Sequence, residues 1–492
     1  MTTIIKARST NAVVAVCSTI ETGRRASGDK LIAKPATVHV TPVTTGPVLR
    51  SYYRKAPLTN REDNRIRQRL DTADLLLAEN KLHEAQAAFT AIIADRKESP
   101  RGHYGYAQAL DLLSEKKQSN ELLEKAIDAY EYLLSLANVP DDLYLLTAER
   151  FIDRSRFRGF WHRALRVQRE LIDKFPDNLS LMNDYGITFL MIGRIKDAKR
   201  VFHDVLLRDP SNAIAQTHYG FVLKVYDNNI DEGVEYLSKG VASGLEGTQD
   251  ARFYFHLGDG LQRLEREDEA HRVYKRGAAK GLFISAFQRS LYNVDDIESH
   301  PWWTLEETGF QKALRTIEKQ WRTIKAEGMG LLRHETEAFT VEDEKLTERG
   351  VVEQFVLYKR GHRLEDNCRR APRTCQAVEK FTEAATCKRG QIKFLALRPG
   401  TEIFPHCGPT NARLRAHLGL TVPSEHGTPK IRVARETRDW SEGRFIVFDD
   451  SFEHQFSYPG RPGAGKPPLL VLVVDFWHPE LTQEQYESLS AL

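Results

Sequence analysis

The sequence predicts an α+β protein of two parts, an arm of helical repeats followed by a β-rich C-terminal domain. Apolar residues recur three and four positions apart from about residue 60 to residue 281, which is the spacing of amphipathic helices. Within this stretch, short motifs return after 34 residues. From about residue 295 onward, short β-like runs separated by Gly, Pro and Asp replace the helical spacing.

The repeat is clearest at two turns that contain proline. Phe175–Asn178 is matched by Asp209–Asn212, and the two prolines lie 34 residues apart. Tyr185-Gly186 and Tyr219-Gly220 keep the same distance. This is the period of tetratricopeptide helix pairs, which stack into a superhelix with a concave groove. The groove is either a surface for peptides and partner proteins or part of a rigid spacer for the next domain.

The C-terminal part is predicted to be antiparallel. Short runs punctuated by turn-forming residues are typical of an antiparallel sandwich or barrel. The predicted strands are Gln391–Leu397, Arg413–Leu420, Lys430–Ala434, Arg444–Phe448 and Leu469–Phe476.

Composition limits the class of protein. Of the 492 residues, 41% are hydrophobic and 28% are charged, as in soluble globular proteins. The formal net charge of +3 is small for this length, so nucleic acid and membrane surfaces are not expected partners. No run of about 18 apolar residues occurs, so no transmembrane helix is visible. Residues 1–55 are basic and poor in acids, which fits either an organelle transit segment or a disordered tail.

Four of the five cysteines fall within forty residues, at Cys368, Cys375, Cys387 and Cys407. No Cys-x-x-Cys motif is present, so zinc binding by thiolates is not expected. Cys368 and Cys375 are close enough in sequence to close a small loop in an oxidising compartment. The sequence equally allows two free thiols.

The run Arg413–Leu420 carries the most informative side chains. Because side chains alternate faces along a strand, Arg413, Arg415 and His417 line one side of it. Facing inward, this row forms a site for carboxylates, since a guanidinium binds a carboxylate through two parallel hydrogen bonds. Facing outward, the row is a solvated surface.

Two histidines flank this row along the chain. His406 precedes the run, and His454 comes 48 residues after His406. Two separated histidines, each beside a strand, can bind a divalent metal through imidazole nitrogen. With 16 histidines in the chain such pairs arise readily by chance, so the pairing by itself is a weak signal.

Four motifs in the C-terminal part are specific enough to compare with known families. They are Gly-Thr-x-x-x-Pro-His-x-Gly-Pro-Thr-Asn at 400–411, Arg-Leu-Arg-x-His-Leu-Gly-Leu at 413–420, Phe-Asp-Asp-Ser-Phe-Glu-His at 448–454 and Asp-Phe-Trp-His-Pro-Glu-Leu at 475–481. Together they resemble the aspartyl/asparaginyl β-hydroxylases. The resemblance continues upstream through 301–303 and 253–259 to about residue 99, so it covers about four-fifths of the chain, repeats included.

The resemblance implies a double-stranded β-helix, or jelly roll, that binds Fe(II). Such an enzyme uses 2-oxoglutarate and O2 to hydroxylate Asp or Asn side chains in epidermal-growth-factor-like domains of proteins. His406 and His454 match the two iron ligands. The family lacks the carboxylate ligand common in such oxygenases, and Gly408 stands at its place. Arg415 and His417 match residues that contact the acids bound near the metal, and Arg413 is expected to contact the substrate.

Three positions depart from the family pattern. Leu395 and Leu469 replace a serine and an arginine that together clasp the far carboxylate of 2-oxoglutarate. Thr347 replaces an arginine usual in substrate recognition. Burying a carboxylate without its partner is costly, so another cation is needed if 2-oxoglutarate is to bind. The candidates are Arg398, Arg461 and Lys466.

The resemblance also bears on the compartment and on the domain limits. Cys368 and Cys375 align with a disulfide of the family, whose members are usually anchored in the endoplasmic reticulum by an N-terminal membrane helix. The endoplasmic reticulum lumen is therefore the expected location, and cytoplasmic or organellar locations stay open because no signal or membrane segment is visible. The expected domains are a disordered basic tail at 1–55, tetratricopeptide-like repeats at 56–288 and the oxygenase domain at 289–492.

Three functional hypotheses follow. The chain is an active Fe(II)- and 2-oxoglutarate-dependent peptide-aspartate β-hydroxylase, or a metal-binding family member with an altered cosubstrate or no activity, or a scaffold that binds peptides in its repeat groove. The two ligand histidines favour the first hypothesis. Leu395 and Leu469 put its activity in question.

Overall fold

A computed structural model describes residues 55–334, 338–342, 346–424, 427–460 and 467–492. The chain divides into two compact units, Met1–Ala215 and Gln216–Leu492, and each is described by itself. Most of the expected N-terminal tail lies outside the described residues, as do Arg461 and Lys466. The domain limits expected at residues 55 and 288 stay predictions.

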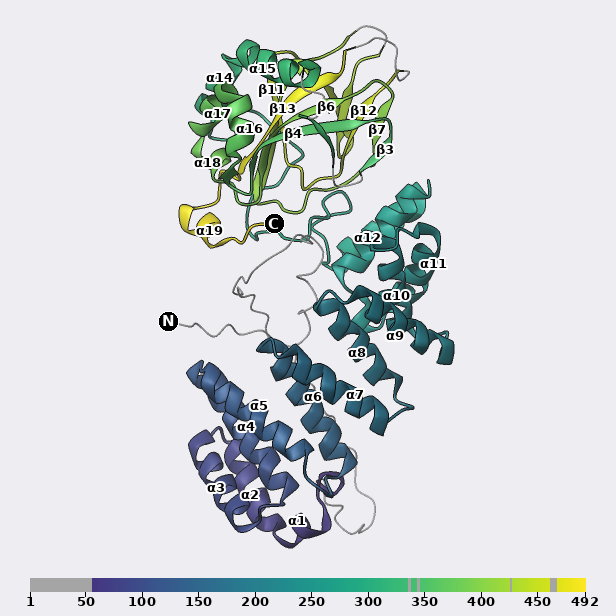
Figure 1. The fold of residues 1–492 in the computed structure, drawn as a ribbon, viewed down its shortest axis with the longest axis vertical. Helices are drawn as coiled ribbons and strands as arrows, with labels where there is room; N and C mark the ends of the chain where they lie inside the picture. Colours follow the sequence, from purple (N-terminus) through teal and green to yellow (C-terminus); the bar gives the residue numbers. More distant parts are fainter. Residues whose placement is uncertain (1–54, 335–337, 343–345, 425–426, 461–466) are drawn as a thin grey trace. The chain divides into compact units, whose positions relative to one another are not determined.

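The described part of the first unit is a stack of helices that pack mainly against their neighbours in sequence, as expected of repeats (Figure 1). Its helices are α1 Arg61–Arg65, α2 Arg67–Ala78, α3 Leu82–Asp95, α4 Pro100–Lys117, α5 Asn120–Leu134, α6 Asp141–Phe157, α7 Trp161–Lys174, α8 Leu179–Met191 and α9 Ile195–Arg208, preceded by the short 3-10 turn Ala56–Leu58. Ser99 begins α4 by accepting a hydrogen bond from the backbone N–H of Gly102, and Pro100 occupies the first turn, where no helical N–H is needed.

Small residues at fixed places explain why the helices approach closely. A Cβ at Gly105 would lie 2.2 Å from the ring of Phe89, and a Cβ at Gly186 would lie 2.7 Å from the ring of Phe202. In both cases an aromatic ring of the paired helix fills the space that a side chain would need. The glycine singled out by the 34-residue repeat is therefore required by packing.

The second unit contains four further helices in the repeat pattern and the sheet-rich domain. The first four are α10 Ala213–Val225, whose first three residues belong to the first unit, α11 Ile230–Ala242, α12 Ala251–Arg263 and α13 Glu267–Ala279, with the 3-10 turn Glu246–Thr248 between α11 and α12. The remaining helices are α14 Gln311–Glu318, α15 Trp321–His334, α16 Glu365–Arg370, α17 Pro372–Glu379, α18 Thr382–Ala385 and α19 Gln483–Ser488.

Two antiparallel sheets form the centre of this domain. One has the order β1-β11-β8-β13-β6-β4-β2, with β5 also paired to β4, and the other has the order β10-β9-β12-β7-β3. The strands are β1 Trp302–Trp303, β2 Thr340–Val341, β3 Thr347–Arg349, β4 Val352–Lys359, β5 His362–Arg363, β6 Gln391–Leu397, β7 Thr401–Ile403, β8 Arg413–Thr421, β9 Lys430–Val433, β10 Glu436–Asp439, β11 Phe445–Phe448, β12 His454–Tyr458 and β13 Leu469–Trp477.

The larger sheet is buried on both faces. Helices α14 to α18 cover one face (Figure 1), where Ile324 and Phe381 share a core with Phe394 and Leu472. The other face packs against the smaller sheet through a second apolar core. This burial explains the near-continuous apolar sequence of β13. The prediction of helical repeats followed by a sheet-rich domain is confirmed.

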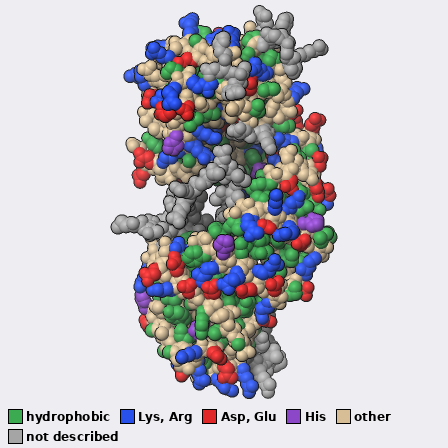
Figure 2. Space-filling model, in the orientation of Figure 1, with side chains coloured by type: hydrophobic (Ala, Val, Ile, Leu, Met, Phe, Trp, Pro, Cys, Tyr) green, Lys and Arg blue, Asp and Glu red, His purple; other side chains and the backbone are tan. Residues whose placement is uncertain are grey.

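The surface agrees with the composition. On the face drawn in Figure 2, basic and acidic side chains are interspersed over the helices, and the sequence contains nearly equal numbers of the two, 71 Lys and Arg against 68 Asp and Glu. Within the part of the chain that the structure describes, no helix is both long and apolar enough to cross a membrane.

Candidate functional site

Two histidines meet beside the smaller sheet. His454 is the first residue of β12, and His406 follows β7, the strand that pairs with β12. The backbone N–H of each donates to the carbonyl of the other, at N···O distances of 3.0 and 2.8 Å. Their ring centroids are 4.2 Å apart. The fold therefore brings together the two histidines that the sequence singles out as metal ligands.

Both imidazoles are held in one tautomer. Nδ1 of His406 lies 2.8 Å from the carbonyl oxygen of Phe404, and Nδ1 of His454 lies 2.9 Å from that of Phe452. A carbonyl oxygen only accepts, so each Nδ1 carries a proton, and Nε2 is the nitrogen with the lone pair when the ring is neutral. Burial, reinforced by the neighbouring His406, holds the pKa of His454 well below its ordinary value of 6.5. Both features suit imidazoles that ligate a metal.

The donor set fits a metal held by two protein ligands. Nε2 of His454 is buried and has no hydrogen-bond partner among the described residues, as a ligand nitrogen would before binding. Those same residues contain no group of three or more His, Cys, Asp or Glu side chains arranged to hold a metal. A Cβ at Gly408 would lie 2.5 Å from Oδ2 of Asp450, so this carboxylate fills the space where a third ligand at 408 would begin.

A buried cluster of ion pairs lies next to the histidine pair. Arg413 Nη2 lies 2.6 Å from Asp450 Oδ2, and Arg415 Nε lies 2.7 Å from Asp475 Oδ1. Each arginine also lies 3.3 Å from the other carboxylate. Burial tends to raise the pKa of Asp450, but Arg413 and Arg415 outweigh it and hold that pKa below 3.8. Asp450 is therefore ionised, and two carboxyl groups face two guanidinium groups in this cluster.

The β8 row faces inward, which settles the question that the sequence left open. Arg413 is buried in the cluster and also donates to the carbonyl of Arg389. His417 lies among Trp440, Phe448 and Phe456. Burial, helped by Arg415, lowers the pKa of His417 to about 3, so its ring is neutral. Its Nδ1 is buried without a hydrogen-bond partner in the described part of the chain.

A small pocket lies between the sheets beside these residues. Its polar lining consists of Glu342, Gln391, Lys393, His406, Arg415 and His417. One predicted metal ligand and both predicted acid-binding residues therefore share one cavity. Arg413 is not among the lining residues.

The residues that depart from the family pattern lie in and beside this pocket. Leu395 lines it, and Leu469 is fully buried in the same apolar core between the sheets. Thr347 lies on β3, opposite Ile403. The proposed substitute cation Arg398 binds Glu353 at 2.7 Å, with 44% of its side chain exposed. Arg398 is thus engaged at the surface.

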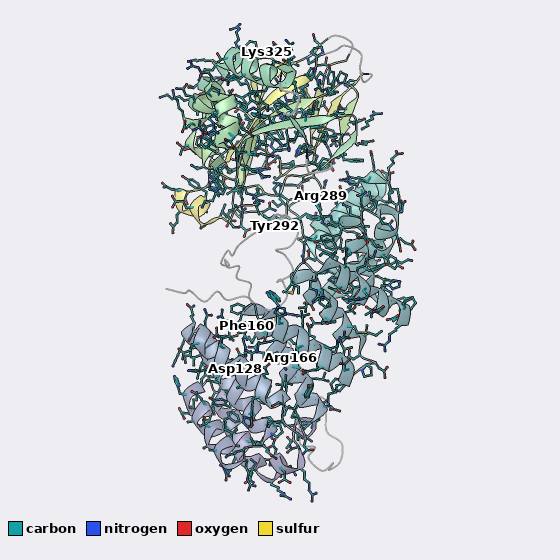
Figure 3. All side chains as sticks on the ribbon, viewed as in Figure 1. Asp128, Phe160, Arg166, Arg289, Tyr292 and Lys325 are labelled. Carbon is teal, nitrogen blue, oxygen red and sulfur yellow. A yellow bond between two sulfur atoms is a disulfide. The ribbon has the colours of Figure 1, made fainter. Side chains whose placement is uncertain are left out.

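Sequence reasoning missed a second buried ion pair that adjoins His454. Arg289, labelled in Figure 3, lies 2.9 Å from Glu453, the residue before His454, and its guanidinium stacks 3.7 Å from the ring centroid of Tyr274. Gln262 of α12 donates to the same carboxylate at 3.4 Å. Helices α12 and α13 thereby contact the segment that carries the histidine. No local pattern marks Arg289, because its partner lies 164 residues away.

Cys368 and Cys375 form a disulfide between α16 and α17, as the resemblance implied. Cys387 and Cys407 are free thiols. Burial raises the pKa of Cys407 to about 11, so this neighbour of His406 is protonated at neutral pH.

Two segments of the chain match models of known families. Residues 318–479 match the family model described as aspartyl/asparaginyl β-hydroxylase, and residues 70–142 match a tetratricopeptide-repeat model. The matched hydroxylase segment contains both histidines, both ion-pair arginines and the pocket.

Three curated relatives place these matches in context. The chain is 44% identical over 439 residues to the aspartyl/asparaginyl β-hydroxylase of Homo sapiens, which covers 89% of this chain and 57% of that protein. The Mus musculus protein of the same name is 42% identical, with 89% and 58% covered. Aspartate β-hydroxylase domain-containing protein 1 of Mus musculus is 37% identical over 139 residues, which is 28% of this chain and 37% of that protein. The chain thus spans a little more than half the length of the first two relatives.

Proposed function

The chain carries an aspartyl/asparaginyl β-hydroxylase domain behind tetratricopeptide repeats, and from this premise we propose that it is an Fe(II)-dependent oxygenase acting on the β-carbon of Asp or Asn residues in proteins. The observation that carries the proposal is the histidine pair. Both rings have Nδ1 fixed as a donor, and Nε2 of His454 is buried without a partner among the described residues. Neutral imidazoles that donate through Nδ1 suit a shared metal.

His406 and His454 would hold the iron, and the chain would add no third side chain where Asp450 fills the space beside Gly408. When bound, the metal with O2 and a 2-oxo acid supplies the oxidation, in which one oxygen atom becomes the substrate hydroxyl, the other enters the carboxylic acid product, and CO2 is released. Arg415 and His417 would orient the carboxylate of the 2-oxo acid from the inner face of β8. The two sheets would exclude water from the reacting groups.

The resemblance points to 2-oxoglutarate as the 2-oxo acid and to epidermal-growth-factor-like domains as the substrates. The proposal includes these substrates and a 2-oxo acid as cosubstrate. The Cys368–Cys375 disulfide supports a location in an oxidising compartment, such as the endoplasmic reticulum lumen, because disulfides persist there.

Metal binding tests the proposal directly. We expect the full chain to bind one Fe(II) in anaerobic equilibrium dialysis and His406→Ala and His454→Ala each to lose it. His362→Ala, at an exposed histidine of β5, is the matched control and should bind as the native chain does. Mass spectrometry of a growth-factor-like domain incubated with Fe(II), O2 and a 2-oxo acid should then show a gain of one oxygen at Asp or Asn. Fe(II) retained in both ligand variants would overturn the assignment of the ligands.

A second function, peptide binding by the repeats, is favoured by one cavity of the first unit. This cavity of about 370 Å³ lies among α7, α8 and α9, and its volume is within the range of about 300–1,000 Å³ usual for ligand sites. Arg169 stacks over the ring of Tyr185 at 5.7 Å, and Arg194 stacks over Phe189 at 4.7 Å. Arg200 lines the same cavity. Arginines beside aromatic lining residues suit a peptide that carries a carboxylate next to an apolar side chain.

Fluorescence polarisation with a labelled peptide containing Glu and Phe would test this function. Arg169→Glu should weaken binding by at least tenfold. Arg65→Glu, at an exposed arginine of α1, should leave it unchanged. Equal binding by both variants would remove the cavity as the peptide site.

A further inference from the structure

The pocket beside the histidine pair changes from polar to apolar along the strands. Register places the inward-facing residues of β6, β13 and β8 in rows across the larger sheet. The first row contains Lys393, Val473 and His417, the second contains Leu395, Val471 and Gly419, and the third joins Leu397 to Leu469. Arg415 lies two residues before His417, on the side away from the second row. On β6, β13 and β8 the polar lining of the pocket therefore ends at the first row. On the neighbouring strand β4, the buried amide of Gln354 lies opposite Leu395 in the second row.

The facing wall is apolar as well. Ile403 of β7, Ile431 and Val433 of β9, and Phe456 of β12 are buried against these rows in one core. Leu395 is 5% exposed and Leu469 is fully buried. Beyond Leu395 the two sheets are thus packed together by hydrocarbon, with the amide of Gln354 at the edge of the second row.

The spacing between rows determines which part of a bound acid contacts these apolar side chains. Successive rows are two residues apart along a strand, which is about 6.6 Å. A small acid whose carboxylate is held by Arg415 and His417 therefore directs its opposite end toward Leu395. A second carboxylate at that end would lose its water and would gain a cation only by displacing Gln354 from Lys393, whereas an alkyl or aryl group would be buried favourably.

Lys393 is the cation that argues for the opposite outcome. It is buried and lines the pocket, but its Nζ donates to Oε1 of Gln354 at 2.8 Å. The backbone of Lys393 lies in the row of His417, and its partner Gln354 lies in the row of Leu395. The far end of an acid extended along the strands therefore gains this cation only if Lys393 leaves Gln354. Arg398, on the strand end beyond Leu397, binds Glu353 at the surface.

We propose that this pocket takes a 2-oxo acid with an apolar side chain, of the kind produced by deamination of leucine, isoleucine or phenylalanine, in preference to 2-oxoglutarate. The inference rests on the proposed function, because Arg415 and His417 orient the acid beside the histidine pair. Leu395 and Leu469 are the residues that set this specificity.

Calorimetric titration of the full chain tests the inference without reference to turnover. Mn(II) replaces Fe(II), because it is not oxidised during the measurement, and its binding is measured first. The chain is then titrated with 4-methyl-2-oxopentanoate and with 2-oxoglutarate. We expect the apolar acid to bind at least tenfold more tightly. Across 2-oxobutanoate, 2-oxopentanoate and 2-oxohexanoate, affinity should rise by about fourfold per added methylene, the factor given by burial of one CH2 group.

Two variants distinguish the effect of the two leucines on the preferred acid from the effect of Lys393. The double variant Leu395→Ser/Leu469→Arg should reverse the preference toward 2-oxoglutarate while Mn(II) affinity stays the same. Lys393→Met should leave the preference for the apolar acid intact. If the double variant does not fold, the chain-length series on the native protein still tests whether the far end of the pocket is apolar.

The outcomes are distinct. Tighter binding of 2-oxoglutarate to the native chain, lost in Lys393→Met, would overturn the inference and assign the far carboxylate to Lys393. Affinities that do not depend on chain length would also overturn it. If Mn(II) does not bind, the proposed function fails, and the inference falls with it. Bound Mn(II) with the reverse order of acids defeats the inference alone.

Discussion

Gly408 provides a direct test of the two-histidine arrangement, because any side chain there competes with a buried carboxylate. A Cβ at this position would lie 2.5 Å from Oδ2, 2.7 Å from Cγ and 2.9 Å from the carbonyl oxygen of Asp450. The carboxylate has no room to retreat, since Arg413 holds it at 2.6 Å and Arg415 at 3.3 Å. Gly408→Ala must therefore strain the backbone or pull the ion pairs apart.

The expected cost follows from these two alternatives. Overpacking a closed interior costs about 1–3 kcal/mol, and breaking a buried ion pair costs about 3–5 kcal/mol. Alanine displaces the carboxylate without removing it, so we expect a loss of roughly 3 kcal/mol. At roughly 2–4 °C per kcal/mol for a domain of this size class, Tm of the second unit should fall by roughly 6–12 °C. Gly408→Asp adds a negative charge beside Asp450 and should be at least as destabilising.

Thermal unfolding by circular dichroism and anaerobic Fe(II) dialysis provide the assay. Gly330→Ala, in helix α15, is the control. Apart from the neighbouring residues and backbone of its own helix, no described atom lies within 4 Å of a Cβ at this position. Its stability should be unchanged or slightly higher, since alanine favours helix over glycine. The reasoning is refuted if Gly408→Ala melts with the native chain, or if Gly408→Asp binds Fe(II) more tightly than the native chain does.

Three further predictions concern the packing around the site. Replacing Cys368 and Cys375 by alanine should lower the free energy of unfolding by about 2.5 kcal/mol, the loop-closure value for a separation of 7 residues, and Tm should then no longer respond to reductant. Arg289→Met should cost about 3 kcal/mol in urea unfolding, because Glu453 stays buried with one arginine partner fewer, and a loss below about 1 kcal/mol would contradict this. Burial tends to raise the pKa of Asp259, but the adjacent Lys224 and Arg263 outweigh burial and hold that pKa below 3.8. Its contribution to stability is therefore complete above about pH 4 and is lost as pH falls through the lower folded pKa. Over that acid range, the urea unfolding midpoint of Asp259→Asn should depend less on pH than that of the native chain. An equal dependence on pH would show that the ion pair contributes nothing.

Local patterns were sufficient for the architecture. The 34-residue repeat, with its spaced glycines, predicted stacked helices, because helix packing demands a small residue wherever an aromatic ring of the next helix must fit. The run 391–397 was predicted as a strand and is β6, because its apolar content and flanking turns are properties of adjacent residues. Motif resemblance singled out His406 and His454, and the structure places their rings side by side.

What these side chains do depended on the tertiary structure. The alternation of β8 showed that Arg413, Arg415 and His417 share a face, but only the second sheet made that face interior. Leu395 and Leu469 looked like separate losses in the sequence, and register places them in successive rows of one apolar core between the sheets. The physical reason is the sequence separation over which each kind of interaction acts. Helix and strand periods act over a few residues, whereas ion pairs such as Arg289–Glu453 join residues 164 positions apart and exist only where the whole chain has folded around them.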